Sequence, residues 1–169
     1  MRTGRFKPQE AEEGKPSKPR LVHMGLESTM AQRVLVVSVR PRWVTEIVSG
    51  RKTVELRRRP PRLDQPVVSL IYETSPGCRL RAKCLMGPIV TNTPRSLWLQ
   101  LGDRSGVTIN EYDAYFAGTL KAYAIEIQRV EEMPAHLSLE YLRQKANFVV
   151  PQSWSWATPR LLEALGMCQ

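Results

Sequence analysis

The sequence predicts an α+β fold built on a mixed, curled β-sheet or small barrel. Five or six segments have the short, β-branched or alternating pattern of strands, and four short segments have the periodicity of helices, with one or two further helical turns at 138–144. The two kinds of segment do not alternate regularly, as they would in a doubly wound protein. With 169 residues, 42% hydrophobic and 24% charged, the chain is long enough for one globular domain and leaves little room for a second.

The predicted elements follow one another from residue 34 onward. The apolar run 34–39 is typical of a buried strand, and the segment 41–49 is a short helix that begins at Pro41 and ends before Gly50. Further strands are predicted at 53–56, 67–74, 79–86 and 119–130, with an extended segment at 150–156. Further helices are predicted to begin near residues 94, 108, 138 and 158, the second of them at a capping box, Thr108-Ile-Asn-Glu111.

Residues 1–29 have the composition of a flexible leader. They are rich in Pro, Glu, Lys and Gly, and Met30 stands just ahead of the first strand. We therefore assign the domain to residues 30–169 and expect residues 1–29 to be dispensable for folding. The thermal midpoint of a 30–169 fragment checks this, because a fall of more than a few degrees would show that the leader packs on the domain.

The composition also argues against several classes of protein. No run reaches the ~20 apolar residues of a membrane span, so we expect no membrane partner. Three cysteines without a CxxC pair are typical of reduced thiols, which favours a cytoplasmic location and leaves a nuclear one open. The two histidines lie far apart and away from cysteine, so we expect no metal site, and no cofactor motif is present.

The net charge of +9 is concentrated in two blocks. Residues 40–62 hold eight basic residues against two acidic ones, and residues 79–83 add three more basic residues. In the second block Leu80, Ala82, Cys84 and Met86 alternate with the charges, which predicts a half-buried strand with a basic outer face. Binding of a polyanion explains this pattern, and a solvated basic surface explains it equally well.

The stretch 52–58 carries the most informative pattern. On a strand Lys52, Val54, Leu56 and Arg58 would share one face, and Thr53, Glu55 and Arg57 the other. Since Val54 and Leu56 favour the core, Glu55 and Arg57 would point together to the opposite side. Such a pair can be a solvated ion pair of little energetic value, which the frequency of exposed charges favours, or it can line a ligand pocket.

The run from Ser38 to Arg58, with its Ser-Gly-x-Lys-Thr turn followed by Glu and Arg on a strand, resembles the opening of the ASCH family. Residues 71–76, 111–118 and 151–154 extend the resemblance to nearly the whole of 34–156. The resemblance implies a small mixed PUA-like β-barrel with short flanking helices and a cleft that binds RNA or a modified base. One branch of the family deacetylates 4-acetylcytidine with a Lys, a Thr and a Glu. The Lys corresponds to Lys52, the Thr position is Glu55 here, and the Glu maps near Glu111.

We therefore expect an RNA- or nucleotide-binding module with a basic cleft. The alternatives are a small hydrolase of a modified nucleoside or a ribonuclease, with Lys52, Glu55 and Glu111 as catalytic candidates, and a module that binds an acidic protein. Tyr115 and Phe116 are expected in the core, as is Trp43, whose less common role would be stacking on a base. The predicted binding residues are Arg40, Lys52, Glu55, Arg57 and Arg58 in the wall, Tyr72 and Ser75 at its border, Arg79, Arg81 and Lys83 along a phosphate track, and Gln152, Ser153 and Trp154 from the C-terminal segment.

Overall fold

The structure is a computed structural model, and it describes residues 33–167. The leader expected at residues 1–29 lies outside the described residues. Within them six strands form one sheet: β1 (Leu35–Val39), β2 (Val54–Arg57), β3 (Val67–Glu73), β4 (Arg79–Asn92), β5 (Ala122–Glu132) and β6 (Trp154–Trp156). The helices are α1 (Pro41–Val48), α2 (Pro94–Leu101), α3 (Ile109–Phe116), α4 (Leu139–Ala146) and α5 (Pro159–Ala164), with a 3₁₀ turn at Gly102–Arg104.

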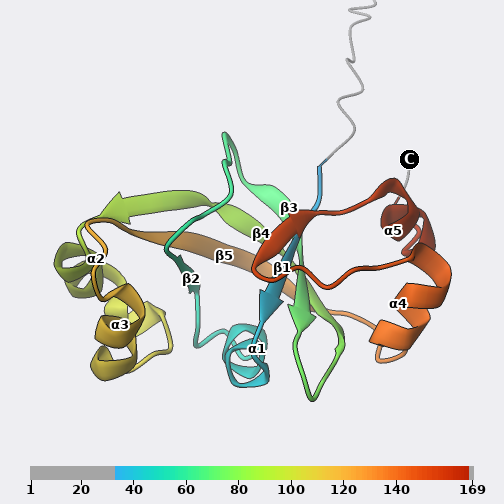
Figure 1. The fold of residues 1–169 in the computed structure, drawn as a ribbon, viewed down its shortest axis with the longest axis horizontal. Helices are drawn as coiled ribbons and strands as arrows, with labels where there is room; N and C mark the ends of the chain where they lie inside the picture. Colours follow the sequence, from blue (N-terminus) through green and yellow to red (C-terminus); the bar gives the residue numbers. More distant parts are fainter. Residues whose placement is uncertain (1–32, 168–169) are drawn as a thin grey trace, which may run out of the picture. The chain divides into compact units, whose positions relative to one another are not determined.

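The sheet is mixed and curls into a half-barrel, which confirms the predicted fold class (Figure 1). Its strand order is β2-β5-β4-β3-β1-β6, with β1 and β3 parallel and the other neighbours antiparallel. The two outer strands, β2 and β6, belong to segments about a hundred residues apart in the sequence. The half-barrel brings β2 close to β1, and the functional site forms there.

Three clusters of buried side chains hold the elements together. The first fills the inside of the half-barrel and packs α1 on it. The second lies between the sheet and helices α4 and α5, and the third lies under α2 and α3. Because β1 contributes alternate residues to the first two clusters, both of its faces are buried, which explains its continuous apolar run.

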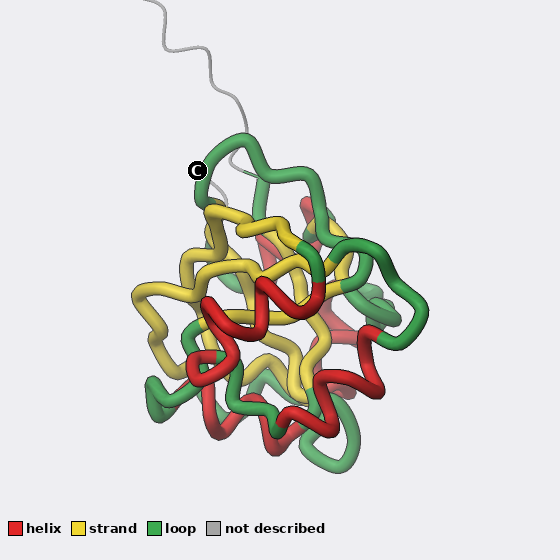
Figure 2. The backbone as a smooth tube through the Cα atoms, turned by 90° about the vertical axis from the view of Figure 1, so that its left-hand side faces the viewer, coloured by secondary structure: helices red, strands yellow, loops and turns green. Residues whose placement is uncertain are grey.

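The helices begin where their capping signals predict. The side chains of Thr93, Thr108, Ser138 and Thr158 each accept a hydrogen bond from the backbone N–H three residues later. The capping box of Thr108 and Glu111 is complete. Figure 2 shows α2 and α3 in front of the curled strands at one end of the sheet. These caps fix where α3 begins and therefore which of its residues face β2.

The strand predicted at 79–86 continues to Asn92. Gly87 and Pro88 suggest a break, but the register between β4 and β5 shifts between Met86 and Ile89, and pairing then resumes to Asn92. Such a bulge absorbs residues that cannot join the ladder. The longer strand carries the chain across to α2, which is how α2 and α3 come to cover the end of the sheet that holds β2.

Candidate functional site

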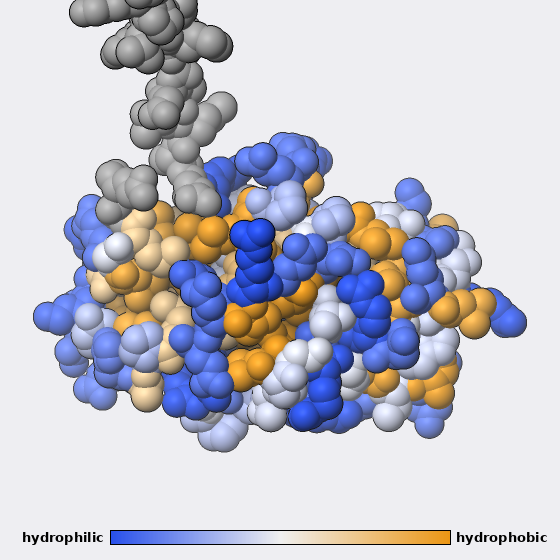
Figure 3. All heavy atoms as spheres, turned by 180° about the vertical axis from the view of Figure 1, so that it is seen from behind, coloured by the Kyte–Doolittle hydropathy of each residue, from blue (hydrophilic) through white to orange (hydrophobic). Residues whose placement is uncertain are grey.

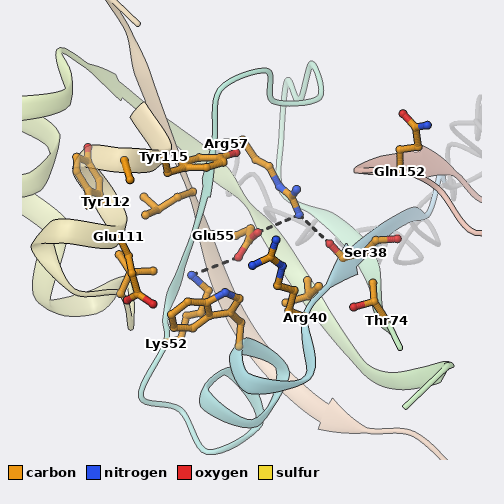
Figure 4. Close-up of a pocket in the computed structure, with 15 residues that line it drawn as sticks. Ser38, Arg40, Lys52, Glu55, Arg57, Thr74, Glu111, Tyr112, Tyr115 and Gln152 are labelled. Atoms are coloured by element: carbon orange, nitrogen blue, oxygen red, sulfur yellow. Dashed lines mark hydrogen bonds and ion pairs between the residues drawn. The ribbon is translucent and has the colours of Figure 1, made fainter. Parts of the chain in front are cut away.

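A cavity of about 550 Å³ opens between β1, β2, α1 and α3. Side chains from all four elements line it, and Figure 4 shows the labelled ones on both sides of β2. Among the predicted residues it brings together Arg40, Lys52, Glu55, Arg57, Glu111 and Gln152. A volume of this size is typical of pockets that hold a small ligand.

Lys52 lies at the inner end of the cavity with only 3% of its side chain exposed. Its Nζ donates to the carbonyls of Val54 at 2.9 Å and Ser105 at 2.7 Å, and lies 3.3 Å from Oε2 of Glu55. These three acceptors match the three N–H donors of an ammonium group. The prediction that Lys52 shares a face with Val54 and Leu56 is wrong, because the strand begins only at Val54 and Lys52 belongs to the turn that precedes it.

Two glycines shape the turns that surround this ammonium group. Gly50 has a φ of +75° and redirects the chain after α1 toward β2. Gly106 has a φ of +70°, and a Cβ built on it would lie 3.4 Å from Cβ of Lys52. The loop after the 3₁₀ turn can therefore pack closely on the lysine stem and place the Ser105 carbonyl over Nζ.

Glu55 and Arg57 point to the same side of β2, opposite Val54 and Leu56, as predicted. Their side chains are only 10% and 12% exposed, so the solvated ion pair that composition favoured is wrong. Oε1 of Glu55 lies 2.9 Å from a terminal nitrogen of Arg57, and Oε2 faces Lys52. The floor of the cavity is thus a buried row of cation, carboxylate and cation, in which each charge faces an opposite one.

Arg57 also joins β2 to β1 and to the C-terminal segment. One terminal nitrogen donates to Oγ of Ser153 at 3.0 Å and the other to the carbonyl of Ser38 at 3.1 Å. Its Nε is buried and has no hydrogen-bond partner among the described residues. The guanidinium is therefore fixed in orientation by the fold.

Arg40 contrasts with the other cations of the cavity because it is exposed and its guanidinium makes no hydrogen bond or ion pair with the described residues. Beside it, Arg42 makes a bidentate ion pair with Glu111 and stacks on the ring of Trp43 at 4.1 Å. Hydrogen bonds from Arg42 and from Thr108 lower the pKa of Glu111 to about 2, so this carboxylate stays ionised at neutral pH.

Two aromatic residues of the cavity were assigned to the core from sequence. Trp43 is half-buried and lines the cavity. Tyr115 is 39% exposed and also lines it, whereas Tyr112 and Phe116 are buried as the core residues of α3. The assignment of Tyr115 to the core is therefore wrong. The spacing of Tyr112 and Phe116, one helical turn apart, already defines the buried stripe and leaves Tyr115 at its edge.

Several predicted binding residues lie outside the cavity lining. Tyr72 points into the core beneath α4 and α5, where burial raises its pKa to about 12. Ser75 is exposed, and its neighbour Thr74 lines the cavity instead. Arg58 lies at the end of β2, where its Nε donates to the carbonyl of Tyr115.

The C-terminal segment also divides between the cavity and its surroundings. Gln152 lines the cavity, and Ser153 reaches it through its hydrogen bond with Arg57. Trp154 packs on the core of the half-barrel, and its indole N–H donates to the carbonyl of Arg59 at 3.2 Å. Trp154 thereby closes the barrel between β6 and the end of β2, the more usual role for such a residue.

The predicted phosphate track on β4 is paired with acidic residues. Arg79 contacts Glu73, Arg81 contacts Glu132, and Lys83 lies 2.9 Å from Glu131. Figure 3 shows the rear face, on which hydrophilic side chains lie among apolar ones. The basic alternation seen in the sequence is therefore matched by carboxylates that arrive on neighbouring strands.

The match to known families agrees with this architecture. The family model described as ASCH domain matches residues 37–153. This chain belongs to the ASCH domain family. A protein from Zymomonas mobilis described as an ASCH domain-containing ribonuclease is 34% identical over 122 residues, covering 72% of this chain and 82% of the relative.

Solved structures show the same fold. The crystal structure of an ASCH protein from Zymomonas mobilis matches with a TM-score of 0.74 and 31% identity, covering 80% of this chain and 94% of that chain. A point mutant of that protein matches with a TM-score of 0.73 and 30% identity, covering 79% and 96%. The half-barrel with its flanking helices is therefore the ASCH fold.

This ASCH domain differs from the deacetylase pattern at the position of its nucleophile. Glu55 stands where that pattern has a Thr, and it faces the cavity. The nearby Thr53 does not line the cavity, and its hydroxyl accepts a hydrogen bond from Nε of Arg104 at 3.0 Å. Position 55 therefore lacks the threonine hydroxyl that would act as the nucleophile in such a hydrolysis.

Neither a metal-ligating cluster nor the buried thiol of Cys84 offers a second site in the part of the ASCH domain that the structure describes. Residues 33–167 contain no group of three or more His, Cys, Asp or Glu side chains arranged to hold a metal ion. Burial raises the pKa of the Cys84 thiol to about 12, so this cysteine is protonated and inert. None of the helices described is both long and apolar enough to span a membrane.

Proposed function

We propose that this ASCH domain binds single-stranded RNA, with one nucleotide in the cavity between β1, β2, α1 and α3. The observation that carries the proposal is that two arginines line a nucleotide-sized cavity. The Arg40 side chain is exposed and has no partner among the described residues, and the guanidinium of Arg57 is held in place by the fold. A planar guanidinium binds phosphate through paired hydrogen bonds. Arg40 has its donors available for this role.

Aromatic side chains favour RNA over a simple anion as the ligand. Trp43 and Tyr115 line the same cavity from α1 and α3, on either side of the charged floor. Proteins that recognise unpaired RNA place bases against aromatic or guanidinium planes. Arg42 over Trp43 and Arg58 over Tyr115, at 4.1 and 5.1 Å from the ring centroids, orient these two rings.

Cleavage of the bound RNA is a second function, favoured by the ribonuclease description of the relative that is 34% identical. RNA is cut when the 2′-oxygen attacks the adjacent phosphorus, the bond to the 5′-oxygen breaks, and the 2′-hydroxyl gives up its proton while the 5′-oxygen gains one from water. We assign acceptance of the 2′-hydroxyl proton to Glu55. Lys52 and Arg57 each engage one of its oxygens, and a carboxylate keeps further lone pairs for a third partner.

Replacing Arg40 by alanine is expected to weaken RNA binding by about 1.5–3 kcal/mol, the value of hydrogen bonds to a charged group. Fluorescence anisotropy with a labelled single-stranded octamer measures the loss. Arg160→Ala is the matched control, since Arg160 is also exposed but lies on α5, away from the cavity. Equal affinities for both variants would rule out Arg40 as a phosphate ligand.

The salt dependence of the same binding reaction is expected to be shallow. Because Arg79, Arg81 and Lys83 are paired with carboxylates, only a few phosphates near the cavity find free cations. With a slope of roughly −0.7 per phosphate for a single strand, the log–log slope should lie near −1 to −2. A slope of about −4 or steeper would show that the β4 track also binds phosphate, and no binding at low salt would refute the proposed function.

A further inference from the structure

The outer edge of β2 carries backbone groups that the sheet does not use. Val54 lies opposite Glu126 and Glu55 opposite Ile125 on β5, and the Ile127 N–H donates to the Thr53 carbonyl at 2.9 Å. In an antiparallel ladder hydrogen-bonded positions alternate along the strand. The backbone groups of Glu55 and Arg57 and the carbonyl of Thr53 therefore point to β5, and those of Val54 and Leu56 point away from it, while the Thr53 N–H donates to the Arg104 carbonyl at 2.9 Å.

Leu56 carries the backbone N–H and carbonyl that the sheet leaves without a partner. The carbonyl of Val54, on the same edge, accepts from Nζ of Lys52, which confirms the direction of this edge. No described residue hydrogen-bonds to the N–H or the carbonyl of Leu56, since β2 pairs with β5 alone. Leu56 is buried and lines the cavity. A donor and an acceptor thus lie side by side on a wall of the cavity, and burying them without partners is costly.

The open part of this edge is too short for another strand. At one end Lys52 bridges the Val54 carbonyl to the Ser105 carbonyl, and at the other Arg58 binds the carbonyl of Tyr115. These contacts join both ends of β2 to the segment that contains α3. What remains between them is a single residue's pair of groups, a site for a flat molecule with one complementary edge.

We propose that the N–H and carbonyl of Leu56 hydrogen-bond the Watson–Crick edge of an unpaired nucleobase. The inference rests on the proposed function and specifies its substrate as RNA that presents a base free of pairing. Each of the four bases carries an adjacent donor and acceptor on that edge, and in a duplex both are occupied by the partner strand. Recognition at Leu56 therefore selects single-stranded over double-stranded RNA through the backbone.

Nuclear magnetic resonance of the full ¹⁵N-labelled chain tests the contact directly. The four nucleoside 5′-monophosphates are the probes, because they contain no phosphodiester to cut. With at least one of them the Leu56 amide proton should move to lower field and exchange more slowly with solvent, while the amide of the exposed Leu120 should not change. Shifts at Ala114 and Tyr115 without slower exchange at Leu56 would overturn the inference alone. No shift at any cavity residue would overturn the proposed function with it.

Methylated RNA tests whether the Watson–Crick edge, and not another part of the base, makes the contact. A single-stranded octamer of uridine should bind about five- to 150-fold more tightly than the same octamer of N3-methyluridine, the discrimination typical of a bidentate base contact. The octamer of 5-methyluridine, whose methyl group lies off the Watson–Crick edge, should bind within about twofold of uridine. Equal binding of all three octamers would refute the Leu56 contact while leaving RNA binding intact, and failure of all three to bind would refute both.

Discussion

Replacing Lys52 by methionine is expected to lower the free energy of unfolding by about 3–5 kcal/mol, the cost of removing one partner from a buried ion pair. The loss follows from the burial of Nζ among the carbonyls of Val54 and Ser105 and the carboxylate of Glu55. Methionine has a similar length, so little packing is lost and the missing charge dominates. Chemical denaturation of the full chain measures the change, which is a large part of the 5–15 kcal/mol that stabilises a typical domain.

Lys83→Met is the matched control for this prediction. Lys83 also forms an ion pair, with Glu131 at 2.9 Å, but these two side chains are 42% and 65% exposed. Such surface pairs contribute about 0–1 kcal/mol, so this variant should unfold almost as the parent does. If Lys52→Met were as stable as Lys83→Met, the ammonium would not hold β2 to the loop before α3.

Replacing Glu55 by glutamine is expected to lower the rate of RNA cleavage about 100- to 10,000-fold, the contribution of general acid–base catalysis. Glutamine keeps the shape of the side chain and a carbonyl oxygen, but it cannot take up the proton of a 2′-hydroxyl. Octamer affinity should change by no more than severalfold, because Arg40 supplies the phosphate contact. Single-turnover cleavage and anisotropy, measured on the same preparations, separate the two effects.

Two controls make this experiment decisive. Glu131→Gln removes an exposed carboxylate on β5 and should cut RNA at the parental rate. An octamer with one 2′-deoxy sugar should resist cleavage at that position only, since the attacking oxygen is gone. Cleavage by Glu55→Gln at the parental rate would exclude Glu55 as the proton acceptor, and no cleavage by the parent protein would limit the function to RNA binding.

Much of the fold could be predicted from local patterns. The capping residues Thr93, Thr108, Ser138 and Thr158 mark the beginnings of four helices because their side chains satisfy backbone donors a few residues away. The alternation or continuity of apolar residues located the strands, but their boundaries differ: β5 begins at Ala122 instead of 119, β6 begins at Trp154 instead of 150, and β4 extends past Gly87. That extension depends on a bulge against β5, a strand that lies far along the chain.

The candidate site was only partly predictable. The period of a strand was enough to place Glu55 and Arg57 on one face, opposite Val54 and Leu56. The strand periodicity alone could not show whether the face with Glu55 and Arg57 is exposed to solvent or buried. The answer depends on β1 and α3, which cover this face. For the same reason Tyr72 was predicted at the border of the cavity from its position on a strand. In the structure β3 directs the Tyr72 side chain toward α4 and α5.

The sequence by itself determined the α+β class, the order of the elements, their caps, and the shared direction of Glu55 and Arg57. These depend on contacts within a few residues, or on a pattern that any strand imposes. Only the tertiary structure decided that Lys52 is buried, that Arg40 keeps free donors, and that carboxylates from β5 pair with Arg81 and Lys83 on β4. Charge pairing acts over a few ångströms in space, and residues that meet across a curled sheet leave no fixed spacing in the sequence.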